Sequence, residues 1–185
     1  MVKSLALAAS APLIRLGLRW RKLAHAAIGR AQLADIKNQG PGCRITGPVT
    51  LVRPDSITLG HHVRINPGCY LQARGGLTIG DYTHLAQNVA IFSANHDIAA
   101  DTLPYGHAFI EKPVHIGRCV WIGMNVNIAP GVTIGDGAII GLGTTVAKDV
   151  PPMAIVVGPA ARQVGERDPE HYERLAAEGK YLTNG

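Results

Sequence analysis

Two histidines of the sequence lie where a side chain could take part in proton transfer. Imidazole exchanges protons near neutral pH, which suits a general base. Of the eight histidines, His96 and His107 fall within residues 92–113, a stretch that carries Pro104, Gly106 and Pro113 and matches no regular pattern. A long irregular segment inside a compact protein is more often functional than a short one. We therefore expect the chemistry of this chain to lie in that stretch.

The cysteines do not suggest a metal site. Cys43, Cys69 and Cys119 are an odd number in no metal-ligand spacing. This favours reduced, small core residues in a cytosolic protein. We expect His61 and His62, at a corner of an early repeat, to be solvated or to lie in a subunit interface, and we assign no metal ligands.

Length and composition indicate one globular domain with many tight turns. The chain has 185 residues, of which 46% are hydrophobic and 17% charged, with 22 Gly and 12 Pro. So few charges exclude a disordered or coiled-coil protein. The formal net charge of +5 arises at the N-terminus, where six Lys and Arg precede the first acid, Asp35. The rest of the chain is nearly neutral, which gives no reason to expect a nucleic-acid partner.

Residues 1–40 are predicted to form a basic amphipathic helical segment. Apolar side chains recur there at spacings of three and four, with cations between them, at Leu13, Leu16, Trp20, Leu23 and Ala27. Residues 1–34 could lie on an anionic membrane surface, or the apolar stripe could pack on the body or on a neighbouring subunit. A secretory signal around LALAASA is a third interpretation, disfavoured by the basic stretch that follows it. The longest uncharged apolar run, residues 4–14, is too short to span a bilayer.

A period of six residues runs through the middle of the chain. Aliphatic residues recur at this spacing from Leu59 to Ile91, apart from one step of eight between Leu71 and Ile79, and again from Ile116 to Val146, and glycine often follows them. Six does not match the helical period, whereas residues two apart in a short strand point to the same side. Three strands and three turns close a triangular coil, and stacked coils share an aliphatic core. We expect an all-β solenoid of about four coils, with residues 45–57 adding another.

The segment from Val114 to Gly158 carries a family resemblance. Its sequence, VHIGRCVWIGMNVNIAPGVTIGDGAIIGLGTTVAKDVPPMAIVVG, resembles the hexapeptide-repeat acyltransferases, above all the galactoside, maltose and polysaccharide O-acetyltransferases. The resemblance implies a left-handed parallel β-helix as domain 41–165, with an excursion at about 92–113. It also implies a homotrimer, with acetyl-CoA bound between adjacent prisms and a sugar or glycan as acceptor.

The resemblance assigns roles on the acceptor side. His96 is expected to be the general base that deprotonates the acceptor hydroxyl directly, with no acyl-enzyme; a histidine that caps a turn is the alternative. Asn66 and Asp97 are expected to bind the acceptor, although Asp97 could simply cap a turn. Trp121 points outward between two inward residues, and either lines the site or makes an interface contact.

For the donor, the resemblance implies a narrow cleft for the pantetheine arm. The backbone N–H of Met124 would hold the thioester oxygen, and Lys148 and Arg162 would meet the phosphates. A solvated surface charge is the alternative for each of these two cations. The residues expected to bind acetyl-CoA are Gly123, Met124, Gly141, Leu142, Ala147, Lys148 and Arg162.

Residues 166–185 are predicted to form a C-terminal helix. Asp168 would be its N-cap, Pro169 would lie in its first turn, and Gly179 would end it. We expect this helix to pack over the last coil and to have no catalytic role.

Other functions remain compatible with the repeat. An acyltransferase of the same fold could act on an amine, an antibiotic or serine. A carbonic anhydrase of this fold would need two zinc-binding histidines five residues apart, which the sequence lacks. A non-catalytic scaffold is the third alternative. We expect the protein in the cytoplasm, either free or at the inner face of the membrane.

Overall fold

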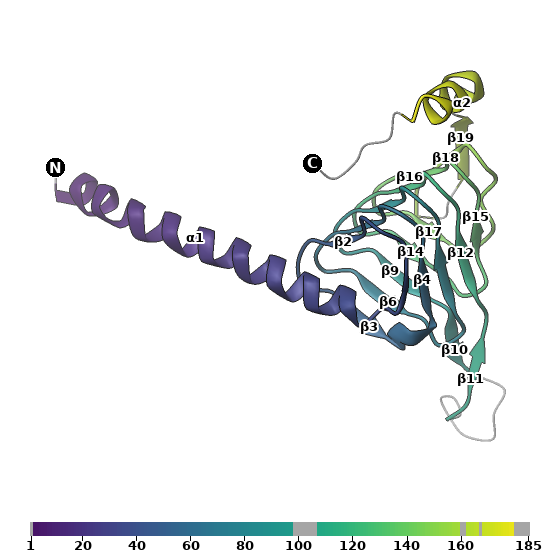
Figure 1. Ribbon diagram of the computed structural model, residues 1–185, viewed down its shortest axis with the longest axis horizontal. Coiled ribbons are helices and arrows are strands. Elements are labelled where there is room, and N and C mark those ends of the chain that lie inside the picture. The colour runs from purple at the N-terminus through teal and green to yellow at the C-terminus, as the bar shows by residue number, and fades with distance from the viewer. Residues whose placement is uncertain (1, 98–106, 160–161, 167, 180–185) are drawn as a thin grey trace.

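The computed structural model describes residues 2–97, 107–159, 162–166 and 168–179. It shows a triangular β-solenoid with one helix at each end of the chain (Figure 1). The solenoid makes about six turns, one more than the sequence predicted. The additional turn comes from Val150, which bridges to Ile134, and from the strand Ala154–Val157. The predicted all-β solenoid with terminal helices is confirmed.

Three sheets of short strands form the walls, and we call them A, B and C. Sheet A contains β1 (Asn38–Gln39), β4 (Ile57–Leu59), β7 (Leu77–Ile79), β12 (Val114–Ile116) and β15 (Thr133–Ile134). Sheet B contains β2 (Arg44–Ile45), β5 (Arg64–Ile65), β8 (His84–Leu85), β13 (Trp121–Ile122), β16 (Ile139–Ile140), β18 (Ala154–Val157) and β19 (Arg162–Glu166). Sheet C contains β3 (Thr50–Val52), β6 (Tyr70–Gln72), β9 (Ala90–Phe92), β14 (Asn127–Ile128) and β17 (Thr145–Val146). All pairs within these sheets are parallel, apart from the antiparallel pair of β18 and β19.

The early coils are longer than the late ones because their corner between sheets C and A is longer. Asn38 and Thr58 are register partners in the early coils, whereas His115 and Thr133 are partners in the late ones. The first long corner holds the short 3-10 helix η1 (Pro54–Ser56), and the second ends at Gly76, whose φ is 97°. A φ in this range is open to glycine without strain.

The six-residue period corresponds to the core. The inward aliphatic residues of every coil are buried, among them Leu71, Ile91, Ile122 and Ile140. Thr83 is a buried polar exception, and its hydroxyl donates to the carbonyl of Gly117 at 2.7 Å. Because inward side chains fill the prism, only outward side chains and corners remain for binding.

The helix α1 (Val2–Ala34) projects from the first coil, and only its C-terminal part meets the solenoid (Figure 1). Ile36, two residues after the helix, is fully buried in the core, and β1 pairs with β4. The solenoid therefore begins a few residues before the predicted boundary at residue 40. Within the described part of the chain, no helix combines the length and the hydropathy needed to cross a membrane.

The helix α2 (Pro169–Ala177) lies at the other end of the solenoid. As predicted, Asp168 caps it, accepting the N–H of Glu170 at 3.0 Å, and Gly179 follows its end with a φ of 64°. Tyr172 is buried, and a side chain at Gly137 would contact its ring, so α2 packs on the last coils. Burial raises the pKa of the Tyr172 hydroxyl.

Candidate active site

The segment between β9 and β12 leaves the solenoid as a β-hairpin. β10 (Ala94–His96) runs antiparallel to β11 (Phe109–Glu111), and the register places His96 opposite Phe109. Residues 98–106 of the predicted excursion lie outside the described residues. The first strand of the hairpin thus carries the histidine that the sequence singled out.

Ser93 fixes the point at which the hairpin leaves the solenoid. Its buried hydroxyl donates to the carbonyl of Gln72 at 3.0 Å and accepts the N–H of Gly75 at 2.9 Å. Its carbonyl accepts the N–H of Lys112 at 2.8 Å, which closes the base of the hairpin. Buried polar groups that find partners hold a backbone in one arrangement.

The side chain of Gln72 ties β6 to the start of the hairpin. Gln72 is buried, and its Nε2 donates to the carbonyl of Ala94 at 3.3 Å while its Oε1 accepts the N–H of Ser93 at 3.2 Å. Asn95 Oδ1 accepts the N–H of His96 at 2.9 Å. The backbone on both sides of Ala94 is therefore held, and His96 has a defined position.

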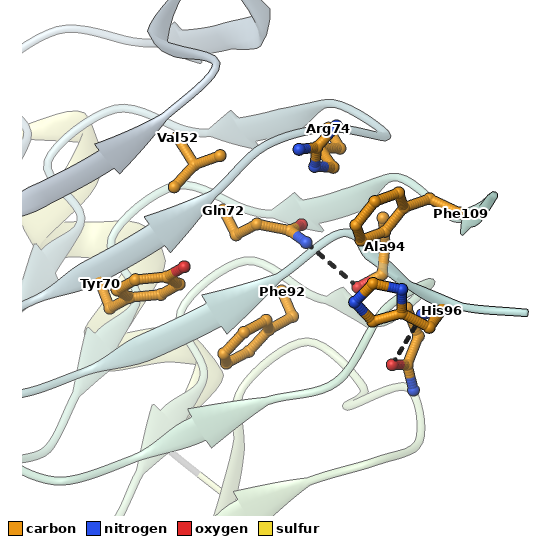
Figure 2. Close-up of a pocket in the computed structure, with 9 residues that line it drawn as sticks. Val52, Tyr70, Gln72, Arg74, Phe92, Ala94, His96 and Phe109 are labelled. Carbon is orange, nitrogen blue, oxygen red and sulfur yellow. Dashed lines mark hydrogen bonds between the residues drawn. The ribbon is translucent and has the colours of Figure 1, made fainter. Parts of the chain in front are cut away.

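A pocket of about 270 Å³ lies between sheet C and the hairpin (Figure 2). Its lining comes from β3, β6, β9, β10, β11 and the corner after β6. The lining residues are Val52, Tyr70, Gln72, Arg74, Phe92, Ala94, Asn95, His96 and Phe109. His96 is the histidine of this pocket and lies half-buried in it.

Aromatic rings and one cation determine the polarity of the pocket lining. The ring of His96 lies 4.3 Å from that of Phe109, centre to centre, and the guanidinium of Arg74 lies 4.2 Å from the centre of the Phe109 ring. The rings of Tyr70 and Phe92 are neighbours at 5.3 Å. In the described part of the chain, neither ion pair involves Arg74. The pocket can therefore hold an acceptor with an apolar face beside a positive charge.

Two of the predicted cofactor residues lie in a second groove, of about 310 Å³, after β17. Ala147 and Lys148 line it, together with Gln163 of β19. Arg162, beside Gln163, is exposed and pairs in register with Val157. Both pockets lie along the edge of sheet C from which its strands run into the corner to sheet A.

The other four predicted cofactor residues lie at the opposite edge of sheet C. Gly123 and Gly141 follow β13 and β16, and their N–H groups donate to the next coil at 2.8 Å each. A Cβ at Gly123 would lie 2.7 Å from the backbone nitrogen of Leu142, so this glycine permits the coils to stack. Met124 and Leu142 are exposed, by 44% and 79%. Within one protomer, the structure does not bring this corner to the His96 pocket.

The predicted acceptor residues fall in three places. Asn66 lies at the corner after β5, where its Nδ2 donates to the carbonyl of Leu85 at 2.8 Å and its Oδ1 accepts from Thr46 at 2.9 Å. Trp121 points outward from sheet B with 58% of its surface exposed. Asp97 follows His96 and is half-buried. Of the three, only Asp97 is placed beside the pocket.

Sheet B holds a second histidine with a perturbed environment. His84 lies in register with Trp121 on one side and Arg64 on the other. Partial burial, and then the positive charge of Arg64, lower the pKa of His84 below its usual value. His84 does not line the His96 pocket.

Sequence reasoning missed most of the pocket lining. Tyr70, Gln72, Arg74, Phe92 and Phe109 were not singled out, although all lie in the strands or corners next to the interruption. The register of the repeat could have identified these residues. Phe92 lies just before the chain leaves the solenoid, and Gln72 is its partner in the preceding coil. Outward residues of the coils that flank a break are the ones that can meet the inserted segment.

The fold and the pocket together define a β-solenoid protein in which the hairpin β10–β11 presents a histidine to an aromatic pocket. In the described part of the chain, no group of three or more His, Cys, Asp and Glu side chains is placed to hold a metal ion. The model of the family "Bacterial transferase hexapeptide (six repeats)" matches residues 113–148.

Two curated relatives extend this match beyond the repeats. Nodulation protein L of Rhizobium meliloti (strain 1021) is 40% identical over 126 residues, which cover 68% of each chain. The galactoside O-acetyltransferase of Escherichia coli (strain K12) is 32% identical over 136 residues, which cover 72% of this chain and 66% of that protein. The chain belongs to the family of bacterial hexapeptide-repeat transferases, and it is an acyltransferase.

Solved structures agree with this assignment. A maltose O-acetyltransferase from Clostridium difficile 630 has a TM-score of 0.57 and 32% identity, over 71% of this chain and 68% of that one. A hexapeptide-repeat acetyltransferase from Vibrio cholerae, in complex with acetyl coenzyme A, has a TM-score of 0.59 and 24% identity, over 79% and 88%. The second of these likenesses shows the fold alone.

Proposed function

We propose that this protein is an acetyl-CoA-dependent O-acetyltransferase that acts on a hydroxyl of a sugar or polysaccharide precursor. The observation that carries the proposal is the position of His96, half-buried in a pocket that a fixed hairpin completes. The names of the relatives support it, since two of them are sugar O-acetyltransferases.

His96 would act as the general base. Its imidazole takes the proton from the acceptor hydroxyl as that oxygen bonds to the carbonyl carbon of the thioester. The carbon–sulfur bond breaks, and His96 returns the proton to the departing sulfur. The hydrogen bonds around Ser93 and Gln72 hold the start of the strand that carries this ring.

The residues around the second groove fit the donor. Bound acetyl-CoA supplies the activated acetyl group, and its phosphates need cations. Lys148 lines the groove and Arg162 lies beside it, both exposed and outside the two ion pairs of the described chain. An ammonium and a guanidinium bind phosphate oxygens through charge-assisted hydrogen bonds.

The rings of Tyr70 and Phe92 would receive the acceptor. Both lie on the outward face of sheet C and line the pocket with His96. A sugar ring has an apolar face of C–H groups that can pack on an aromatic ring, and its hydroxyls then point to polar neighbours. The aromatic lining thus favours a sugar over a small, fully polar acceptor.

A complete site would need a second copy of the chain. His96 and Lys148 lie at one edge of sheet C, whereas Met124 and Leu142 lie at the other, where they are exposed and line neither pocket. A neighbouring copy can bring its Met124 corner against the His96 edge, and a closed ring of such contacts is symmetric. We infer a homotrimer, with one site at each of three interfaces.

Subunit mixing tests the shared site. Two inactive variants, His96→Ala and Leu142→Asp, are unfolded together and refolded as a mixture. An interface in a mixed trimer is intact when the Leu142→Asp chain supplies its His96 edge and the His96→Ala chain supplies its Leu142 corner. With random assembly from equal amounts, about a quarter of the interfaces meet this condition, so about a quarter of the wild-type activity should return. Refolding each variant alone is the control. If the mixture stays inactive although light scattering shows mixed trimers, the site lies within one protomer.

Thiol release from acetyl-CoA, measured against a panel of sugars, oligosaccharides and amines, tests the reaction itself. The expected product is an ester, which hydroxylamine cleaves, whereas an amide formed on an amine survives this treatment. Lys148→Ala should raise KM for acetyl-CoA and leave KM for the acceptor unchanged. Turnover with amines alone would replace the proposal by N-acetylation.

The free cysteines support the cytoplasm as the compartment. Cys43, Cys69 and Cys119 form no disulfide, and burial raises the pKa of the Cys69 thiol to about 11. Free thiols persist where the surroundings are reducing.

A further inference from the structure

The end of α1 meets the solenoid through one narrow face. Gly29 is buried against the backbone of Ile45, and Gln32 accepts the N–H of Val49 at 3.0 Å. Leu33 packs against the core. These contacts fix the rotation of the helix about its own axis. Because an α-helix turns by about 100° per residue, they also determine which way each remaining position of α1 faces.

Four apolar residues lie on the opposite face of α1, and we call them the outer stripe. They are Leu16, Trp20, Leu23 and Ala27. Ala27 precedes the buried Gly29 by two positions, and two residues of α-helix correspond to a rotation of about 200°. The outer stripe therefore faces away from the solenoid, and Trp20 and Leu23 are exposed by 65% and 62%. The body of the same chain cannot cover it.

Five cations line the same part of the helix. They are Arg15, Arg19, Arg21, Lys22 and Arg30. α1 contains no Asp or Glu, and neither ion pair of the described chain involves it. At about 100° per residue, Arg19 and Arg30 flank the outer stripe, whereas Arg15, Arg21 and Lys22 lie toward the other side of the helix. No acid of α1 neutralises this positive charge.

The charge pattern of α1 distinguishes between two partners that could cover the outer stripe, a second copy of α1 and a lipid bilayer. A second α1 packed on the outer stripe would place the cations of both helices side by side, whereas helices that pair through such stripes alternate acids and bases at their flanks. An anionic bilayer accommodates both features, because the apolar face enters the acyl boundary and the cations meet the headgroups. An indole at the centre of the stripe suits the membrane–water interface.

We propose that α1 docks in the plane of an anionic lipid bilayer through the outer stripe and its flanking cations. The solenoid then stands on the water side, because its contacts with α1 lie on the opposite face of the helix. The inference does not depend on the reaction that the pocket performs.

Vesicle binding of the full-length protein tests the proposal. Sedimentation with vesicles of phosphatidylcholine and phosphatidylglycerol should recover the protein, and vesicles of phosphatidylcholine alone should recover much less. Each cation removed, for example Arg19→Gln, should weaken binding roughly fivefold. In a Trp121→Phe background, the remaining Trp20 should shift its emission to the blue when vesicles are added.

A pair of leucines provides the matched control. Leu23→Gln alters the outer stripe and should weaken vesicle binding more than tenfold. Leu18→Gln alters an exposed leucine on the other side of the helix and should change it little. Equal effects of the two, or no binding to anionic vesicles, would overturn the proposal. So would a Leu23→Gln variant that changes the oligomeric state by light scattering yet binds vesicles normally, since the stripe would then be an interface between copies.

Discussion

Replacing His96 with alanine tests the chemistry of the pocket most directly. Alanine removes the imidazole and leaves the hairpin backbone, whose hydrogen bonds come from Ser93, Gln72 and Asn95. We expect kcat to fall roughly 10²–10⁴-fold, which corresponds to about 3–5 kcal/mol of transition-state stabilisation.

The structure limits what else His96→Ala should change. The ring of His96 packs at a tilt against that of Phe109, and an aromatic contact of this kind contributes about 0.5–1.5 kcal/mol. The melting temperature should therefore fall by only a few degrees. KM for acetyl-CoA should stay nearly constant, because Lys148 and Arg162 lie on other strands and corners.

The assay is thiol release from acetyl-CoA at saturating acceptor, with two further variants. His96→Asn keeps a hydrogen-bonding side chain but cannot accept the proton, so it should be as slow as alanine. His107→Ala, at an exposed position of the same excursion, should retain most activity. Near wild-type turnover by His96→Ala would refute the mechanism.

Three further outcomes follow from the solenoid itself. Gly123→Ala places a Cβ 2.7 Å from a backbone nitrogen of the next coil and should lower the free energy of unfolding by about 1–3 kcal/mol, whereas Gly165→Ala, with open space around it, should not; denaturant titration measures both. The lowered pKa of His84 means that the unfolded chain binds its proton first as the pH falls, so wild-type stability should drop more between about pH 8 and pH 5 than that of His84→Gln. Deleting residues 1–24 removes most of α1 and its helical circular dichroism but should leave the melting temperature of the solenoid unchanged, whereas deleting residues 1–40 also removes a buried core residue and β1 and should lower that temperature.

The solenoid could be predicted because its physics repeats. Each coil buries aliphatic side chains at the same two positions. The six-residue spacing of aliphatic residues from Ile116 to Val146 therefore identifies the core residues of these coils directly. The sixth turn was missed because β18 follows a corner with two prolines, Pro151 and Pro152, and breaks the six-residue spacing. The helix α2 was predicted from its cap at Asp168, which is a local signal.

The pocket could be predicted only in part because it depends on contacts distant in sequence. His96 stood out through its residue type and its place in the interruption. Tyr70 and Arg74 lie more than twenty residues earlier, and only the packing of the hairpin on sheet C brings them beside His96. Asn66 shows the converse, since a residue type suited to binding is used in hydrogen bonds between coils.

The geometry of the prism explains why both proposed binding regions lie where the repeat ends or changes. A regular coil turns its aliphatic side chains inward and uses its N–H and C=O groups on the neighbouring coils, so only its outward side chains are left for binding. A concave site therefore requires something added to a wall. The hairpin β10–β11 adds such an edge beside Tyr70 and Phe92, and β19 adds one beside Lys148. In the described part of the chain, neither of these pockets includes Met124 or Leu142, which is why the proposed homotrimer assigns their corner to a site shared with a neighbouring prism.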